Sequence, residues 1–236
     1  LLHDRPDTEA IILDDAFQHR TIRAGLNILL TDYGNLFTRD FYLPTGDLRD
    51  LVSSYKRADI IVVTKCKEDL SKEEAEKIRK EINPLPQQQL YFTTIRYWHP
   101  YHITKKEQLV FDPEIEVLLV TGIANPRPLK KLLEEHTGAY HMMQYGDHHI
   151  YRIDDLGDIK KRFADIEGEK KIILTTEKDA VRLLKFSNEL QDEPMYVIPI
   201  RHYFLFQGEI GFNKSVHDFI SNFKTQATGI LKRMNQ

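Results

Sequence analysis

Two neighbouring aspartates directly follow a short apolar run near the start of the sequence. The run is Ala10–Leu13; Asp14 and Asp15 come next, with Gln18 and His19 just beyond. Apolar β-formers without alternation predict a strand buried on both faces of a parallel sheet. Open α/β sheets bind ligands at the carboxyl ends of their strands, and Mg²⁺ prefers oxygen ligands. We therefore expect a ligand-binding or metal-binding site at the end of this strand, although an aspartate can also simply cap the next helix or turn.

Three further polar clusters fall at predicted strand ends or on adjoining loops. They are Arg49 with Asp50, Asp147 with His148, and the segment 175–179. An aspartate beside a histidine can orient the imidazole for general-base work, and an arginine fork can clamp a phosphate. Each cluster also has an ordinary interpretation, as a surface ion pair, a solvent-facing turn or the charged first turn of a helix.

The spacing of apolar residues predicts the elements that carry these clusters. Strands are expected at 10–13, 27–32, 59–64, 90–97, 116–120, 142–145, 171–175, 195–200 and 202–206, and helices at 48–55, 71–82, 128–136, 153–166, 177–186 and 214–223. Ser71 and Glu74 form a capping-box pattern, and Thr176 is expected to cap a helix. The tail from Lys224 is expected to be loosely ordered. This order predicts a doubly wound α/β sheet with right-handed crossovers.

The same pattern predicts two domains. Residues 1–96 are expected to form an incomplete core with a parallel sheet, 97–110 a linker, and 111–200 a second, smaller α/β domain. Residues 201–236 are expected to supply a linker strand and a C-terminal helix that return to the core.

Composition excludes several classes of protein. The 236 residues carry a net charge of −3. A nucleic-acid-binding protein would usually have an excess of basic residues, so the composition argues against that class. The single cysteine, Cys66, allows no disulfide framework and indicates a reducing compartment. It follows an apolar strand, so we expect a small core or edge residue rather than a catalytic thiol. No signal peptide is visible, and no apolar run approaches the roughly 20 residues of a membrane-spanning helix.

Several catalytic motifs are absent from the sequence. It contains no HExxH zinc pattern, no GxSxG elbow, no GxGxxG turn and no GxxxxGK[ST] phosphate loop. The sequence begins Leu1-Leu2 rather than with Met, and these leucines resemble the end of a helix. We therefore expect a preceding segment that carries the phosphate loop, and we expect residues 1–236 alone to be inactive.

Seven segments together resemble one family, the tetraacyldisaccharide 4′-kinases of lipid A biosynthesis. The segments are IILDDAFQHR (11–20), LNILLTDY (26–33), LPTGDLRD (43–50), RADIIVVTK (57–65), TGIANP (121–126), GDHHIY (146–151) and LTTEKDAVRL (174–183). They occur in family order over nearly the whole chain. The resemblance implies a P-loop NTPase-like α/β core, here without its N-terminal part, and a second, smaller α/β domain.

The resemblance also implies roles for residues of this chain. Asp14 is expected to hold Mg²⁺; the catalytic residues are expected to be Asp15, Asp147 and His148, and the ATP-binding residues Gln18, Arg49, Asp50 and Lys178. Three positions depart from the family pattern: Ala16 stands where Gly is common, Asp47 where Pro is common, and Asp50 where Glu is usual. Asp50 keeps the negative charge of the usual Glu but has a shorter side chain.

The implied reaction is in-line transfer of the ATP γ-phosphate to the 4′-hydroxyl of an acylated glucosamine disaccharide 1-phosphate, with Mg²⁺. The implied location is peripheral, on the cytoplasmic face of the inner membrane, with no nucleic-acid partner. Two alternatives stay open. One is another P-loop NTPase such as a GTPase-like switch. A loop that recognises guanine needs Asp two residues after Lys65, however, and that position is Lys67. The other is a non-catalytic α/β binding module.

Overall fold

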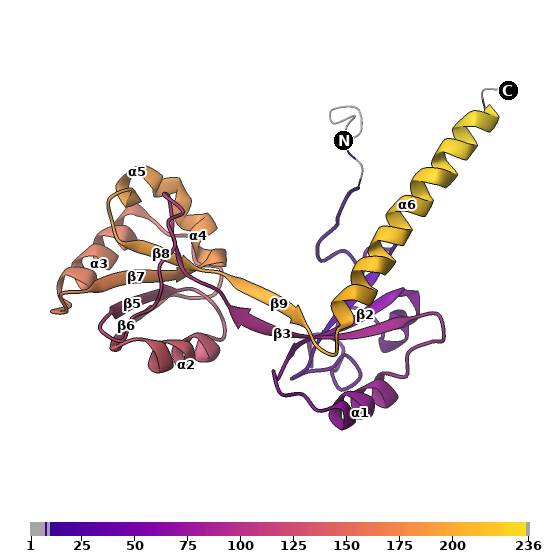
Figure 1. Ribbon diagram of the computed structural model, residues 1–236, viewed down its shortest axis with the longest axis horizontal. Helices are drawn as coiled ribbons and strands as arrows, with labels where there is room; N and C mark the ends of the chain where they lie inside the picture. The colour runs from indigo at the N-terminus through magenta and orange to yellow at the C-terminus, as the bar shows by residue number, and fades with distance from the viewer. Residues whose placement is uncertain (1–7, 9, 235–236) are drawn as a thin grey trace. The chain divides into compact units, whose positions relative to one another are not determined.

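The computed structural model describes residue 8 and residues 10–234, with the backbone alone for 224–234. The chain divides into two compact units (Figure 1). Unit 1 comprises Leu1–Ile95 and His202–Gln236, and unit 2 comprises Arg96–Arg201. The domains predicted from the sequence are parts that fold independently. Their limits therefore stay a prediction. Among the described helices, none is both long enough and apolar enough to span a bilayer.

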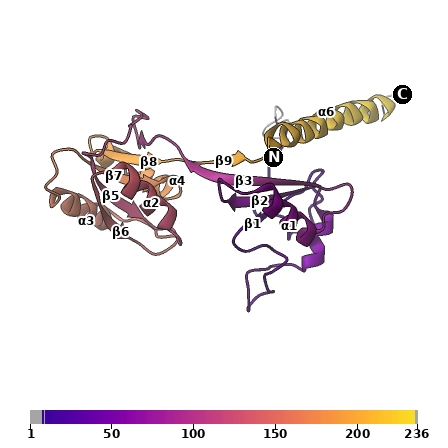
Figure 2. The ribbon, with the colours of Figure 1, turned by 60° about the horizontal axis from the view of Figure 1, so that its bottom comes forward.

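Unit 1 is built on a four-stranded sheet in the order β1-β2-β3-β9. The strands are β1 (Ile28–Asp32), β2 (Ile60–Cys66), β3 (Gln89–Tyr97) and β9 (Ile200–Phe204). β1, β2 and β3 are parallel, and Figure 2 shows them side by side. β2 is buried on both faces along its first four residues, as its uninterrupted apolar run predicts.

One helix packs on each face of this sheet. α1 (Lys72–Ile82) begins with the predicted capping box, in which Glu74 N–H donates to Ser71 Oγ at 3.1 Å and Ser71 N–H donates to the Glu74 carboxylate at 3.4 Å. α1 buries Ile78 in the same apolar cluster as strand residues of β2 and β3. On the opposite face, the first turns of α6 (Gly208–Met234) pack against Tyr91 of β3.

Three expectations for unit 1 are wrong. Residues 10–13 form no strand, and the Ile12 side chain is 93% exposed, because no described strand lies beside this segment to complete its backbone hydrogen bonds. The helix expected at 48–55 is a 3₁₀ helix at Val52–Arg57. The tail expected to be loosely ordered continues α6 as far as Met234. The predicted helix end at Leu1-Leu2 lies outside the described residues.

Unit 2 is built on a five-stranded sheet in the order β4-β8-β7-β5-β6. The strands are β4 (Tyr101–His102), β5 (Glu116–Thr121), β6 (Ala139–Gln144), β7 (Lys171–Thr176) and β8 (Met195–Ile198). All pairs are parallel except β4 with β8, which is antiparallel. β4 has no counterpart among the predicted strands; its two residues are too short to give a period-2 pattern.

The helices of unit 2 cover both faces of its sheet, as Figure 1 shows. They are α2 (Arg127–His136), α3 (Ile153–Ala164), α4 (Glu177–Leu183), the 3₁₀ helix η2 (Leu184–Phe186) and α5 (Ser187–Leu190). Along β5, Val117 and Leu119 share an apolar cluster with α2, whereas Leu118 and Val120 share another with α3 and α4. This alternation is the period of a strand buried on both faces. The predicted doubly wound arrangement is therefore confirmed in this unit.

Candidate active site

The first group of predicted residues lies on two loops of unit 1. Arg49 Nη1 is 2.6 Å from Asp15 Oδ2, and both side chains are more than half exposed. Asp15 has the left-handed backbone value φ = 48°, which aspartate tolerates. Gln18 Nε2 donates to the backbone oxygen of Asp15 at 2.9 Å. The hydrogen bond and charge of Arg49 lower the pKa of Asp15, so this carboxylate is an anion at neutral pH.

Asp50 organises the loop that carries Arg49. Its Oδ1 accepts from Arg20 and its Oδ2 from Arg57, each at 2.8 Å, and its Oδ1 also accepts from Leu51 N–H at 2.8 Å. Partial burial acts to raise the pKa of Asp50, but the Leu51 N–H and its other hydrogen-bond partners lower it overall. Both carboxylate oxygens therefore accept hydrogen bonds within the protein, so Asp50 fixes the position of this loop.

Asp14 is an exposed carboxylate next to Asp15 in the chain. Within the described ranges, no group of three His, Cys, Asp or Glu side chains is placed to hold a metal ion. Mg²⁺ does not require such a cage, because it is commonly held by one or two carboxylates together with phosphate oxygens and water. The exposed Asp14 oxygens fit that mode of binding.

The second group lies in unit 2, around the loop after β6. Lys178 Nζ is 2.7 Å from Asp147 Oδ1 and 3.4 Å from His148 Nε2. Arg182 Nη2 is 3.1 Å from His148 Nδ1. The hydrogen bond from Lys178 is the main cause that holds the pKa of Asp147 below its ordinary value. This group therefore combines two cations, one carboxylate and one imidazole.

The two neighbouring histidines of this loop have different surroundings. His149 Nε2 is 3.0 Å from Asp155 Oδ2, and its ring stacks on Tyr145 with 4.5 Å between centroids. His148 has a 72% exposed side chain and the left-handed backbone value φ = 61°. His149 is thus fixed by packing at the start of α3, whereas His148 is the histidine that a ligand can reach.

A buried aspartate ties together the loops beneath His148. Asp179, wholly buried, accepts at Oδ2 from Thr121 Oγ1 at 3.3 Å, Gly122 N–H at 3.0 Å and Thr176 Oγ1 at 2.8 Å. Thr176 also caps α4 as predicted, accepting from Asp179 N–H. Gly122 allows a close approach here, because a Cβ would lie 3.0 Å from the Gly146 oxygen and 3.1 Å from Asp179 Oδ1.

These loops follow the carboxyl ends of β5, β6 and β7. The connection after β5 leads to α2 on one face of the sheet, and the connection after β7 leads to α4 on the other. Neighbouring strands whose helices leave on opposite faces mark the point where open α/β sheets bind ligands. The structure thus brings together two clusters that the sequence analysis listed separately, Asp147 with His148 and the segment that holds Lys178.

Arg182 escaped the sequence analysis. It stands within the LTTEKDAVRL segment, four residues after Lys178, and residues four apart share one face of a helix. That spacing was the available signal. It indicates that both cations of α4 point to the same side.

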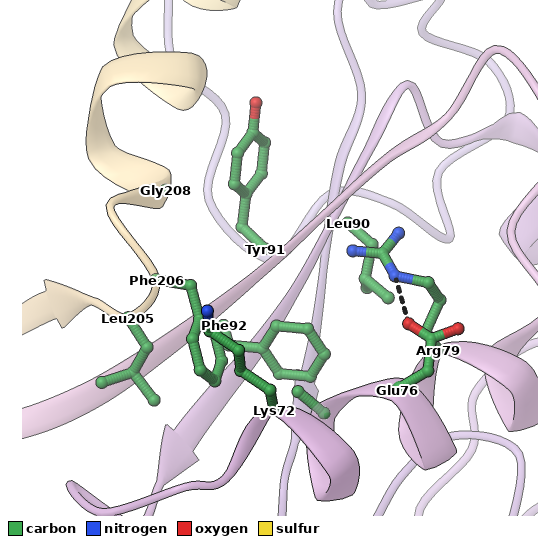
Figure 3. Close-up of a pocket in the computed structure, with 10 residues that line it drawn as sticks. Lys72, Glu76, Arg79, Leu90, Tyr91, Phe92, Leu205, Phe206 and Gly208 are labelled. Carbon is green, nitrogen blue, oxygen red and sulfur yellow. Dashed lines mark ion pairs between the residues drawn. The ribbon is translucent and has the colours of Figure 1, made fainter.

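A pocket of unit 1 lies apart from all these residues. It has a volume of about 380 Å³ and lies between α1, β3 and the turn before α6 (Figure 3). Leu90 and Phe92 contribute apolar side chains, and the pair Arg79–Glu76, 3.5 Å apart, lies at its side. None of the residues singled out in the sequence lines it.

Comparison with known proteins identifies the family. Residues 1–220 match the family model described as Tetraacyldisaccharide-1-P 4′-kinase. The chain belongs to the tetraacyldisaccharide-1-P 4′-kinase family. The resemblance seen in the seven segments is therefore confirmed. The matched range includes both groups of candidate residues.

Two curated relatives give the extent of the similarity. The chain is 38% identical over 229 residues to the Tetraacyldisaccharide 4′-kinase of Bacteroides thetaiotaomicron, a match that covers 91% of this chain and 60% of the relative. It is 39% identical over 226 residues to that of Phocaeicola vulgatus, covering 92% and 61%. The chain thus spans about three fifths of the length of these family members.

A solved structure shares the fold. A crystal structure of "apo" form LpxK from Aquifex aeolicus in complex with ATP superposes with a TM-score of 0.57 and 22% sequence identity. The match covers 87% of this chain and 56% of that one. The α/β fold expected from the resemblance is therefore confirmed, with the P-loop NTPase-like core that this family has.

Proposed function

We propose that the protein transfers the γ-phosphate of ATP to the 4′-hydroxyl of a tetraacyldisaccharide 1-phosphate. The observation that carries the proposal is the family match over residues 1–220, which includes the carboxylate and cation groups of both units. The shared fold with a structure in complex with ATP supports a nucleotide as the phosphate donor. Transfer of this kind depends on positioning and on neutralising charge, and the candidate residues are of the types that do both.

In unit 1, we assign the nucleotide side of the reaction to the loops around Asp15. Asp14 would contribute a carboxylate oxygen to Mg²⁺, which when bound would offset the charge of the phosphates. Arg49 carries a guanidinium held by Asp15 at 2.6 Å and is exposed enough to reach a phosphate oxygen. Gln18 holds the same loop through the Asp15 carbonyl. Asp50 acts on the site through the loop that it fixes.

In unit 2, we assign the acceptor hydroxyl to the group around His148. His148, with Asp147, would assist removal of the hydroxyl proton. Lys178 is bound to Asp147 at 2.7 Å and supplies positive charge close to the ring. These groups lie at a strand-end crevice, where a ligand of an α/β sheet is expected.

The acceptor's four acyl chains make a membrane surface the natural place for the reaction. We propose peripheral contact with the cytoplasmic face of the inner membrane, because ATP is available there and the acyl chains stay in the bilayer. Flotation with vesicles that contain the acceptor measures this directly. Recovery of the protein only in the vesicle-free fraction would contradict it.

The deciding experiment is ATP-dependent phosphorylation of a tetraacyl-disaccharide 1-phosphate by the product of the whole open reading frame. We expect labelled product from [γ-³²P]ATP and a loss on the order of 100-fold with Asp14→Asn. Asp192→Asn, an exposed acid on the loop before β8, is the matched control and should retain full activity. No transfer by a folded, lipid-supplied protein would favour another P-loop NTPase if ATP is still hydrolysed, or a binding module if it is not.

A second variant tests His148. His148→Asn suits the left-handed backbone, which asparagine tolerates, so it removes the imidazole with little strain. We expect kcat to fall by about 10²-fold or more. A kcat close to that of the unaltered protein would show that the ring takes no part in the transfer.

A further inference from the structure

Arg182 links a buried carboxylate to the exposed ring of His148. Its Nη1 lies 3.6 Å from Asp179 Oδ1, and its Nη2 lies 3.1 Å from His148 Nδ1. The Arg182 side chain is 23% exposed, whereas that of Asp179 is fully buried. The planar guanidinium therefore presents one nitrogen to each partner.

The inner end of this link is held firmly. Asp179 Oδ2 already accepts from three donors of the loops after β5 and β7. Asp179 Oδ1 and Arg182 Nη1 are both buried and have no hydrogen-bond partner among the residues that the structure describes. They face one another at 3.6 Å, so the opposite charges help to compensate each other's burial. The buried Tyr151 hydroxyl also interacts with the Asp179 carboxylate. The carboxylate thus fixes the direction of the guanidinium.

The outer end constrains the imidazole. A guanidinium is always protonated and can only donate, so His148 Nδ1 must accept from it. Lys178 also faces the ring, at 3.4 Å from Nε2, but a neutral imidazole can accept at one nitrogen only. The Arg182 contact is shorter, and the Lys178 ammonium has the Asp147 carboxylate at 2.7 Å for its proton. Nδ1 is therefore the acceptor, and Nε2 carries the hydrogen.

We infer that Arg182, held by Asp179, is a positioning residue that selects the tautomer of His148 with the proton on Nε2. In that tautomer the ring can donate a hydrogen bond from Nε2 but cannot accept one there. His148 would then assist removal of the hydroxyl proton without taking that proton itself: Nε2–H would donate to the hydroxyl oxygen, on which negative charge develops as the proton passes to another group. The inference rests on the proposed function for the role of His148, but not for the state of its ring.

The state of the ring is measured by nitrogen NMR. Protein with ¹⁵N-labelled histidine, in the product of the whole open reading frame, gives long-range ¹H–¹⁵N correlations that separate protonated from unprotonated ring nitrogens, and His148→Asn assigns the signal. We expect His148 to show an unprotonated, hydrogen-bonded Nδ1. We expect Arg182→Met to lose that hydrogen-bond signature and Arg182→Lys to retain it. A proton on Nδ1 in the unaltered protein, or an unchanged spectrum in Arg182→Met, would overturn the inference.

Two controls keep the result interpretable. The signal of His149, bound to Asp155 at 3.0 Å, should stay unchanged in every folded variant and so reports on folding of this loop. Arg162→Met removes an exposed arginine of α3 and should leave the His148 signal as it is. If Arg182→Met alters both histidine signals, Arg182→Lys decides: loss of the His148 signature there, with His149 intact, would also overturn the inference.

Activity provides the second readout. We expect Arg182→Met to lower kcat on the order of 100-fold with little change in KM for ATP, and Arg182→Lys to recover most of the loss. An unchanged kcat in Arg182→Met would refute the positioning role. The NMR measurement needs no substrate, so a protein that transfers no phosphate but shows the expected tautomer would refute the proposed function alone. A protein that transfers phosphate with the opposite tautomer would refute only this inference.

Discussion

At the scale of single residues, the exposed pair Asp15–Arg49 separates function from stability. Both side chains are more than half exposed, and exposed ion pairs contribute only about 0–1 kcal/mol to folding. Arg49→Gln should therefore change the free energy of unfolding by less than about 1 kcal/mol. It should lower phosphate transfer on the order of 100-fold, because it removes a charged donor from the phosphate side of the site.

The matched control for Arg49 is Arg39, an exposed arginine of the same unit. It binds Glu81 through two hydrogen bonds of 2.7 and 2.6 Å. Arg39→Gln should have a similarly small effect on urea unfolding and none on transfer. Equal losses of activity in the two variants would remove Arg49 from the site.

Cys66 should be unreactive in the native protein. The thiol is 5% exposed and lies 3.4 Å from the Val63 carbonyl oxygen. Burial raises its pKa to about 11, so the reactive thiolate forms only as the pH approaches that value. We expect negligible alkylation by iodoacetamide at pH 7.5 and complete alkylation in urea, measured by mass spectrometry. Ser187→Cys, an exposed position on α5, should add one rapidly labelled thiol; fast native labelling of Cys66 itself would contradict its burial.

At the scale of secondary-structure elements, two glycines of unit 2 should respond in opposite directions to the same substitution. Gly122 lies where a Cβ would meet the Gly146 oxygen at 3.0 Å, whereas nothing lies within 4 Å of a Cβ at Gly157 in α3. Gly122→Ala should destabilise the protein by about 1–3 kcal/mol through overpacking. Gly157→Ala should stabilise it by about 0.5–1 kcal/mol, because alanine favours the helix. Urea unfolding measures both, and destabilisation of similar size in both would show that the close approach at Gly122 is not the cause.

Elements with a local signal could be predicted from the sequence. β2, β5 and β7 are uninterrupted apolar runs, and α1 and α4 begin with capping side chains a few residues from what they cap. The segment 10–13 has the same apolar character but no described strand beside it. An apolar run forms a strand only where another strand completes its backbone hydrogen bonds, and that other strand lies elsewhere in the sequence.

The sequence suggested which residues belong to the candidate site, but it did not predict which of them contact one another. Asp147 with His148, and the segment that holds Lys178, were expected as two separate clusters at strand ends or on adjoining loops, where open α/β sheets bind ligands. That His149 is fixed by Asp155 and Tyr145 while His148 is exposed follows from packing across several elements, which neighbouring letters do not encode. The pairing of Arg49 with Asp15 likewise joins loops 34 residues apart.

At the scale of the whole molecule, each unit has an apolar core of its own. Leu118 is fully buried in a cluster of unit 2, and Ile61 is fully buried in the cluster of unit 1. Replacement of either by alanine should cost about 2–5 kcal/mol. Hydrogen exchange followed by mass spectrometry should show lost protection in unit 2 for Leu118→Ala and in unit 1 for Ile61→Ala. Loss of protection spread evenly over both units in each variant would show that the chain unfolds as one cooperative domain.

The division of the chain has a consequence for how such a gene can be edited. Unit 2 interrupts unit 1 between Ile95, on β3, and His202, on β9, and these two strands are neighbours in one sheet. Within unit 1 they are joined by the hydrogen bond from Leu205 N–H to the Phe92 oxygen, 2.9 Å long. Unit 2 thus occupies the place of a hairpin turn. Deleting codons 96–201 and inserting a two-residue Asn-Gly turn should reconnect the strands, because short turns of that type join adjacent strands.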